Sequence, residues 1–200
     1  MDVGLGGGEI PYLLSRFGFE TYGLDDTYGN TRTKSERAKL YPHLKLELCD
    51  LERNRFPFET KMFDFITCLH TIEHLPVSPK HFLSEIFRVL KDRGRFYLSQ
   101  PNIAQLNKRL SFLLKRNSPH ANVRKWFTTE PEYYEGHARE YTLSEIEWMT
   151  REIGLKIIDS GHINMLYLRK HDFIHSKLFP IFTFFFRSGR DTTFCVLEKP

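Results

Sequence analysis

The chain begins MDVGLGGGEI (residues 1–10) and places four glycines in one short run, Gly4, Gly6, Gly7 and Gly8. Such a run is typical of a junction between a strand and a helix, where missing side chains let a ligand lie against the backbone. The nicotinamide fingerprint G-x-G-x-x-G, counted from Gly4, would place its third glycine at position 9, which is Glu9. Because that carboxylate would repel a pyrophosphate, the D-x-G-x-G-x-G spacing from Asp2 favours a ligand without phosphates.

Beyond this run, segments patterned as strands alternate with segments patterned as helices. Strands are predicted at 19–24, 44–49, 62–69, 95–102, 155–166 and 192–199, and helices at 31–41, 78–94 and 143–154. The second of these helices has Ser78 as its predicted N-cap, Pro79 in its first position and Gly94 at its end. The third begins with a capping box formed by Thr142 and Glu145. This alternation predicts an α/β fold with a parallel sheet covered by helices on both faces.

In such sheets a ligand binds beyond the carboxyl ends of the strands, so the residues at those ends are informative. Asp25 ends the second strand and can accept both hydroxyls of a ribose, with Asp26 as the alternative acceptor. Asp50 ends the third strand and can accept from an exocyclic amine such as that of adenine. A ligand with a ribose, an adenine, no phosphate and a cationic tail describes S-adenosylmethionine.

These stretches together resemble the class I S-adenosylmethionine-dependent methyltransferases. The matching segments, in the order the family has them, are DVGLGGG (2–8), GLDD (23–26), LCDLERNRFPF (48–58), FDFITCLHTIEHL (63–75) and FRVLKDRGRFYLSQPN (87–102). The segment GHAREYTLSEIEWMTREIGLKIID (136–159) resembles the small-molecule branch, of methyltransferase type 11/12, which includes members linked to quinone and cell-surface polysaccharide synthesis.

The resemblance implies a Rossmann-like, doubly wound, mostly parallel sheet with an antiparallel last strand. The N-terminus would be truncated, since only Met1 precedes Asp2, and weaker cofactor affinity would follow. It also implies one methyltransferase domain over residues 1–200. Its parts would be a cofactor-binding half (1–102), a lid or acceptor insertion (103–141), and a closing helix and strands (142–200).

The resemblance also carries the family's cofactor contacts onto residues of this chain. Glycines would underlie the methionine and ribose of S-adenosylmethionine, and acidic and apolar side chains would surround its other groups. The residues are Gly4, Gly6 and Gly8 below the cofactor, Asp2 near its amino group, Asp25 at the ribose, Asp50 and Leu51 at the adenine, and Leu69 and His70 at the methionine end.

The segment HTIEH (70–74) also matches the H-x-x-E-H pattern of a class of zinc proteases. Pro76 ends this segment soon after a buried strand, so the long metal-binding helix of those proteases does not fit. Some members of the resembled family use this segment for a divalent ion, which leaves a metal at Glu73 and His74 as an alternative. The favoured interpretation has no metal, with Glu73 and His74 capping the turn after the fourth strand.

Methyl transfer is a direct displacement, for which an enzyme aligns the acceptor with the methyl group. An oxygen acceptor benefits from a base that titrates near neutral pH, and histidine meets that need. The candidates are His70, beside the expected methyl position, and His137, in the segment that would cover the acceptor. Both histidines could instead only line the site, and an acceptor that is already nucleophilic needs no base.

Residues 103–116 form a predicted basic amphipathic helix with Ile103, Leu106, Leu110, Leu113 and Leu114 on one face and Lys108, Arg109, Lys115 and Arg116 on the other. One interpretation is a lid that packs on its leucines. A second is a peripheral membrane contact for a lipid-linked acceptor, to which the phenylalanine-rich segment 173–186 would add. A third is binding of RNA, which the net charge of only +4 and the absence of an added RNA-binding module disfavour.

The remaining composition fits a cytoplasmic protein, either soluble or in contact with a membrane. Three widely spaced cysteines in apolar stretches predict reduced, buried thiols, and no apolar run reaches the roughly 20 residues of a spanning helix. We therefore expect a methyltransferase that O-methylates a small or lipid- or sugar-linked acceptor. The alternatives are an RNA ribose methyltransferase and a homologue that binds the cofactor without turnover.

Overall fold

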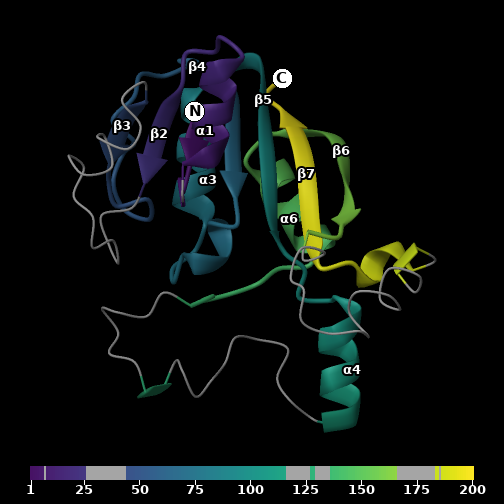
Figure 1. Ribbon diagram of the computed structural model, residues 1–200. Helices are drawn as coiled ribbons and strands as arrows, with labels where there is room; N and C mark the ends of the chain where they lie inside the picture. The colour runs from purple at the N-terminus through teal and green to yellow at the C-terminus, as the bar shows by residue number, and fades with distance from the viewer. Residues whose placement is uncertain (7, 26–43, 116–126, 129–135, 166–182, 185) are drawn as a thin grey trace.

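The computed structural model describes residues 1–6, 8–25, 44–115, 127–128, 136–165, 183–184 and 186–200. The predicted helix at 31–41 and most of the segment 173–186 lie outside these residues. The described part is built around one seven-stranded sheet (Figure 1).

The sheet has the strand order β3-β2-β1-β4-β5-β7-β6. Its strands are β1 (Asp2–Val3), β2 (Tyr22–Asp25), β3 (Lys45–Leu48), β4 (Phe63–Leu69), β5 (Leu90–Pro101), β6 (Lys156–Ile163) and β7 (Thr192–Glu198). The pairs among β1 to β5 are parallel, whereas β7 runs antiparallel to both β5 and β6. This arrangement confirms the predicted Rossmann-like, mostly parallel sheet with an antiparallel last strand.

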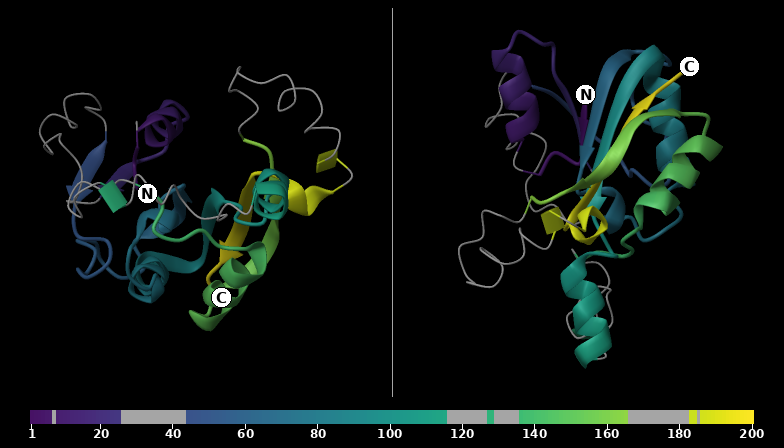
Figure 2. Two further views of the ribbon diagram at one scale, coloured as in Figure 1. Left: turned by 90° about the horizontal axis from the view of Figure 1, so that it is seen from below. Right: turned by 90° about the vertical axis from the view of Figure 1, so that its right-hand side faces the viewer.

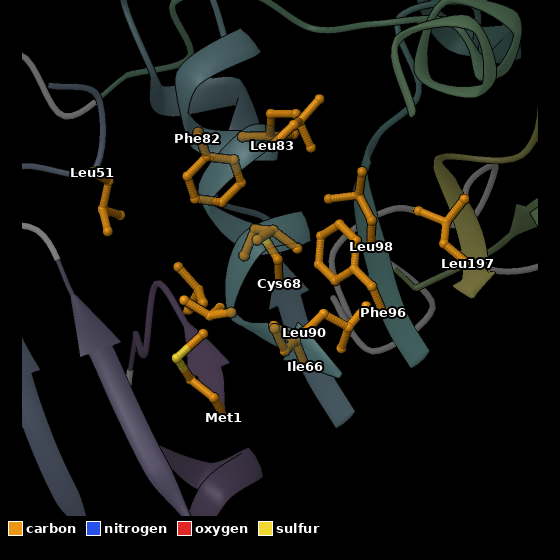
Figure 3. Close-up of a cluster of buried hydrophobic side chains, with 14 of the residues drawn as sticks. Met1, Leu51, Ile66, Cys68, Phe82, Leu83, Leu90, Phe96, Leu98 and Leu197 are labelled. Carbon is orange, nitrogen blue, oxygen red and sulfur yellow. The ribbon is translucent and has the colours of Figure 1, made fainter. Parts of the chain in front are cut away.

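Helices lie on both faces of the sheet, as predicted. Figure 2 shows α1 (Glu9–Arg16) on one face and α3 (Lys80–Val89) with α6 (Leu143–Glu152) on the other. The core under α3 joins Phe82 and Leu83 of that helix to Ile66, Phe96 and Leu98 of the sheet (Figure 3). All five side chains are at most 1% exposed, so α3 is fixed by the burial of its apolar stripe.

The helix ends are partly as the sequence predicts. Thr142 and Glu145 form the expected capping box at the start of α6. The prediction for α3 was wrong at its end, because the helix stops at Val89 and Gly94 lies within β5. Leu90 has extended backbone angles and pairs with Phe63 of β4, and this tertiary pairing draws the chain out of the helix before the glycine is reached.

Helix α4 (Leu106–Lys115) extends beyond the end of the sheet at which the parallel strands finish (Figure 1). Its first turn packs against Gly189 of η5 (Arg187–Gly189), where an added side-chain carbon would lie 3.2 Å from Cβ of Leu106. Leu113 and Leu114 are 72% and 78% exposed. The expectation of a lid that packs on all of its leucines was therefore wrong for the outer half of α4.

Two further expectations concern the sulfur atoms and the membrane. Cys49, Cys68 and Cys195 are free and buried, as predicted. Within the described residues, no helix combines the length and the apolar character that crossing a membrane requires.

Candidate active site

The glycines after β1 form a tight loop that leads into α1. Gly4, Gly6 and Gly8 have φ angles of 74°, 50° and 80°, in the left-handed region that glycine adopts without strain. A side-chain carbon added at Gly6 would meet nothing within 4 Å. The loop therefore presents open backbone at Gly6, which fits the close approach of a ligand such as S-adenosylmethionine.

Gly4 faces the protein rather than open space. A side-chain carbon at Gly4 would lie 1.9 Å from Oγ1 of Thr71. That hydroxyl is 3.2 Å from two backbone acceptors, the carbonyl oxygens of Val3 and Leu69. Thr71 thus locks the segment after β4 onto the glycine loop, and it does so only because residue 4 has no side chain.

The carboxylates predicted at the strand ends lie at neighbouring positions of the sheet. Asp2, Asp25 and Asp50 are only 4–8% exposed, and they come from β1, from β2 and from the residue pair that follows β3. Because β3, β2 and β1 are adjacent and parallel, these three aspartates share the carboxyl edge of the sheet with the glycine loop. The predicted cofactor residues of the first three strands are thereby brought together.

Asp50 and Leu51 also have structural roles that the sequence did not reveal. Oδ1 of Asp50 accepts hydrogen bonds from the backbone N–H groups of Glu52 and Arg53, at 2.9 and 3.0 Å, and so shapes its own loop. Leu51 is 1% exposed and belongs to the hydrophobic core (Figure 3). Leu69 ends β4, and both Leu69 and His70 are half-buried beside Thr71.

Asp2 is the aspartate of this edge whose pKa is moved. Burial raises the pKa of Asp2 to about 6, against the opposing effect of a hydrogen bond from the hydroxyl of Thr67 on β4. The terminal ammonium of Met1 also faces it and lowers the pKa. A carboxylate that is costly to ionise in isolation gains most from a cationic partner, which fits its expected place near the amino group of the cofactor.

Cofactor binding should consequently depend on pH through Asp2. The ammonium of the ligand pairs with the ionised carboxylate, so affinity for S-adenosylhomocysteine should be full above the Asp2 pKa and about tenfold weaker at pH 5 than at pH 7. Calorimetry across this range measures the slope. Asp2→Asn should flatten it, whereas the exposed Asp64→Asn should leave it unchanged; an identical slope in wild type and Asp2→Asn would contradict the assignment.

A second polar group follows β4, in η1 (Ile72–His74). Glu73 is fully buried at 0% exposure, and neither of its carboxylate oxygens has a hydrogen-bond partner. Nδ1 of His70 lies 3.4 Å from Oε1 of Glu73, and His70 itself has a left-handed φ of 52°. The expectation that the Glu73 side chain caps the turn was wrong, because a cap would place a backbone N–H on that carboxylate.

His137 belongs to the same group although it lies more than 60 residues further along the chain. The rings of His74 and His137 are 4.9 Å apart and nearly perpendicular. Nδ1 of His74 donates to the carbonyl oxygen of Gly136 at 3.2 Å. The backbone N–H groups of Ala138 and Arg139 both donate to the carbonyl oxygen of Glu73, at 2.7 and 3.1 Å.

His137 is held by a buried ion pair. Its Nδ1 donates to Oε1 of Glu140 at 2.8 Å, and Nζ of Lys108 on α4 binds the other oxygen of Glu140. The hydrogen bond to Glu140 raises the pKa of His137. Burial pushes the pKa of Glu140 upward, but its bonds to His137 and Lys108 outweigh this effect and keep that pKa below its usual value. One cation of α4 is therefore committed to the site rather than to solvent.

Three residues of the site escaped the sequence analysis: Thr67, Thr71 and Glu140. The two threonines act through contacts with β1 that only the sheet creates, and no local pattern marks them. Glu140 stands three residues after His137, and an acidic residue so close to a candidate base was a signal that could have identified it.

Comparisons with known proteins agree with this geometry. Residues 1–98 match the family model described as a methyltransferase domain. A curated relative, the ubiquinone biosynthesis O-methyltransferase of Glaesserella parasuis serovar 5 (strain SH0165), is 28% identical over 108 residues, which are 51% of this chain and 44% of the relative. The chain thus matches less than half the length of that relative.

Solved structures match over the whole chain at low sequence identity. A putative methyltransferase from Haloferax volcanii, solved in complex with the Trm112 methyltransferase activator, has a TM-score of 0.67 at 19% identity and covers 100% of this chain and 81% of its own. A putative S-adenosylmethionine-dependent methyltransferase from Listeria monocytogenes has a TM-score of 0.63 at 15% identity, covering 100% of this chain and 89% of its own. At these identities the structures establish the fold.

The family match, the sheet order and the glycine loop with its flanking aspartates all lead to one family, whose cofactor is S-adenosylmethionine. The chain belongs to the class I S-adenosylmethionine-dependent methyltransferases.

Proposed function

We propose that the protein transfers a methyl group from S-adenosylmethionine to an oxygen atom of a small acceptor or of a lipid- or sugar-linked acceptor. The observation that carries this proposal is the group of imidazoles and carboxylates after β4, which Thr71 fastens to the glycine loop. A site that only stored the cofactor would have no need of polar side chains beside its methionine end.

The cofactor contacts follow the positions at the sheet edge. The backbone at Gly4, Gly6 and Gly8 would lie under the cofactor, Asp2 would bind its amino group and Asp25 its ribose hydroxyls. Asp50 and Leu51 would adjoin the adenine, with Oδ2 as the Asp50 oxygen left beside the two backbone bonds of Oδ1. When bound, S-adenosylmethionine supplies a methyl group on a sulfonium, which is open to direct displacement.

His70 and His137 are the two side chains that we assign to the acceptor. His70 directly precedes Thr71 and is therefore fixed close to the glycine loop, while His137 approaches from the segment after α4. A hydroxyl acceptor gives up its proton as its oxygen is methylated, and an imidazole is a suitable recipient near neutral pH. The two histidines would also align that oxygen for in-line attack.

The exposed end of α4 supports an acceptor that is carried by a lipid. Phe112, Leu113 and Leu114 are more than half exposed, and Arg109 on the same helix is exposed as well. Exposed apolar and cationic side chains on a projecting helix suit the surface of an anionic membrane. The protein would then work in the cytoplasm at a membrane surface, where its free cysteines would stay reduced.

Incubation with S-adenosylmethionine that carries a labelled methyl group tests the proposal. Cell extract would be divided into aqueous metabolites, a lipid extract and RNA, and label should enter the metabolite or lipid fraction as an O-methyl group. His70→Asn, which keeps a residue tolerant of left-handed backbone angles, should lower kcat about 100-fold without changing cofactor affinity.

His81→Asn is the matched control, since His81 lies on α3 and bonds only the carbonyl oxygen of Asn54 at 3.0 Å. Its kcat should equal that of the wild type. Label found only in RNA, and lost after nuclease treatment, would replace the proposal by ribose methylation. Cofactor binding without label in any fraction would show a homologue that lacks turnover.

A further inference from the structure

Glu73 presents an unusual arrangement for a protein interior. Its carboxylate is fully buried, both oxygens lack a hydrogen bond, and the side chain with potential positive charge at a printed distance, His70, is 3.4 Å away. Burying a carboxylate without hydrogen bonds is strongly unfavourable unless a cation or a proton neutralises it. A partner for Glu73 is therefore expected at this place.

The two neighbouring histidines are oriented as metal ligands usually are. His74 donates from Nδ1 to a backbone carbonyl and His137 donates from Nδ1 to a carboxylate. Such bonds fix the tautomer of a ligating histidine and direct Nε2 to the ion. Ligand atoms of Glu73, His74 and His137 all lie within 4.8 Å of one another.

The group is also built into the backbone. The N–H groups of Ala138 and Arg139 tie the His137 segment to the carbonyl oxygen of Glu73, so a tertiary clamp holds the three side chains together. The Glu140 carboxylate that orients His137 is itself neutralised by Lys108. The negative charge left without a partner is that of Glu73.

We propose that Glu73, His74 and His137 bind one divalent transition-metal ion, with Zn²⁺ as the representative. Two imidazoles and one carboxylate suit Zn²⁺ or Mn²⁺, whereas Mg²⁺ and Ca²⁺ prefer sites made of oxygen ligands alone. Three protein ligands leave a coordination position open.

The open position gives the ion a task, and this step rests on the proposed function. The acceptor hydroxyl would occupy it, and coordination would lower the pKa of that hydroxyl and so ease its deprotonation. His137 is then a ligand instead of a proton acceptor, and the proton released from the hydroxyl passes to His70, which stands outside the ligand set. The oxygen that has lost its proton forms the new bond to the methyl group.

Metal binding can be measured without any methyl transfer. Protein stripped with a chelator would be titrated with Zn²⁺ by calorimetry, and with Co²⁺ while its visible absorption spectrum is recorded. The wild type should bind one ion per chain with a dissociation constant below about 1 µM. Glu73→Gln and His137→Ala should each weaken binding at least about 100-fold, and Glu140→Gln about 10- to 100-fold.

His81→Asn serves as the control for adventitious binding to an exposed histidine and should bind like the wild type. Misfolding is separated by urea unfolding of the metal-free proteins, in which Glu73→Gln should be at least as stable as the wild type because it removes a buried charge. Equal Zn²⁺ uptake by wild type and Glu73→Gln, including none in either, overturns the proposal. Binding of S-adenosylhomocysteine and methyl transfer are read separately, so failure of the metal site is distinct from failure of the proposed function.

Discussion

Gly4→Ala is expected to lower the free energy of unfolding by about 3 kcal/mol, as the sum of backbone strain and overpacking. The new methyl group would lie 1.9 Å from Oγ1 and 2.5 Å from Cγ2 of Thr71, and the φ angle of 74° disfavours any side chain. Thr71 has little freedom to retreat, because its hydroxyl is bound between backbone carbonyls of Val3 and Leu69. Equilibrium unfolding in urea measures the loss.

Gly6→Ala is the matched control within the same loop. Its φ is 50° and an added carbon meets nothing within 4 Å, so only the strain of about 1 kcal/mol should appear in stability. The space at Gly6 is open to the ligand, and we expect this variant to weaken binding of S-adenosylhomocysteine instead. Equal destabilisation by the two variants would show that the contact with Thr71 is not what requires glycine at position 4.

Asp25→Asn is expected to weaken binding of S-adenosylhomocysteine about 100-fold, which corresponds to roughly 2.7 kcal/mol. Asp25 ends β2 at the carboxyl edge and is 7% exposed, so hydroxyls that bind it do so largely out of water. The amide keeps the shape of the side chain but loses the charge and one acceptor oxygen. Calorimetry of wild type and variant gives the ratio directly.

Two aspartates serve as comparisons for Asp25. Asp64→Asn removes an exposed charge that pairs with Lys91 and should leave affinity unchanged. Asp26→Asn tests the alternative ribose acceptor, which lies outside the described residues. A larger loss from Asp26→Asn than from Asp25→Asn would transfer the ribose contact to Asp26.

Local patterns in the sequence were sufficient for the sheet and for one edge of the site. The glycine run, Asp25 and Asp50 each follow a strand directly, and parallel strands bring such residues to one edge by geometry alone. The capping box at Thr142 was likewise predictable, because its bonds join residues three positions apart.

Contacts between distant segments were not predictable in this way. The end of α3 depends on the pairing of Leu90 with Phe63, and the need for glycine at position 4 depends on Thr71. The outer leucines of α4 follow a helical stripe in the sequence, but whether a surface covers them is decided by where the rest of the chain lies.

The sequence by itself determined that this protein has a class I methyltransferase fold and where S-adenosylmethionine binds, because each of those features is written in the residues beside a strand end. Only the tertiary structure showed that Glu73, His74 and His137 form one group with Glu140 behind it. The physical reason is that the two halves of this group meet through backbone hydrogen bonds between segments more than 60 residues apart, which leave no periodic pattern in either segment.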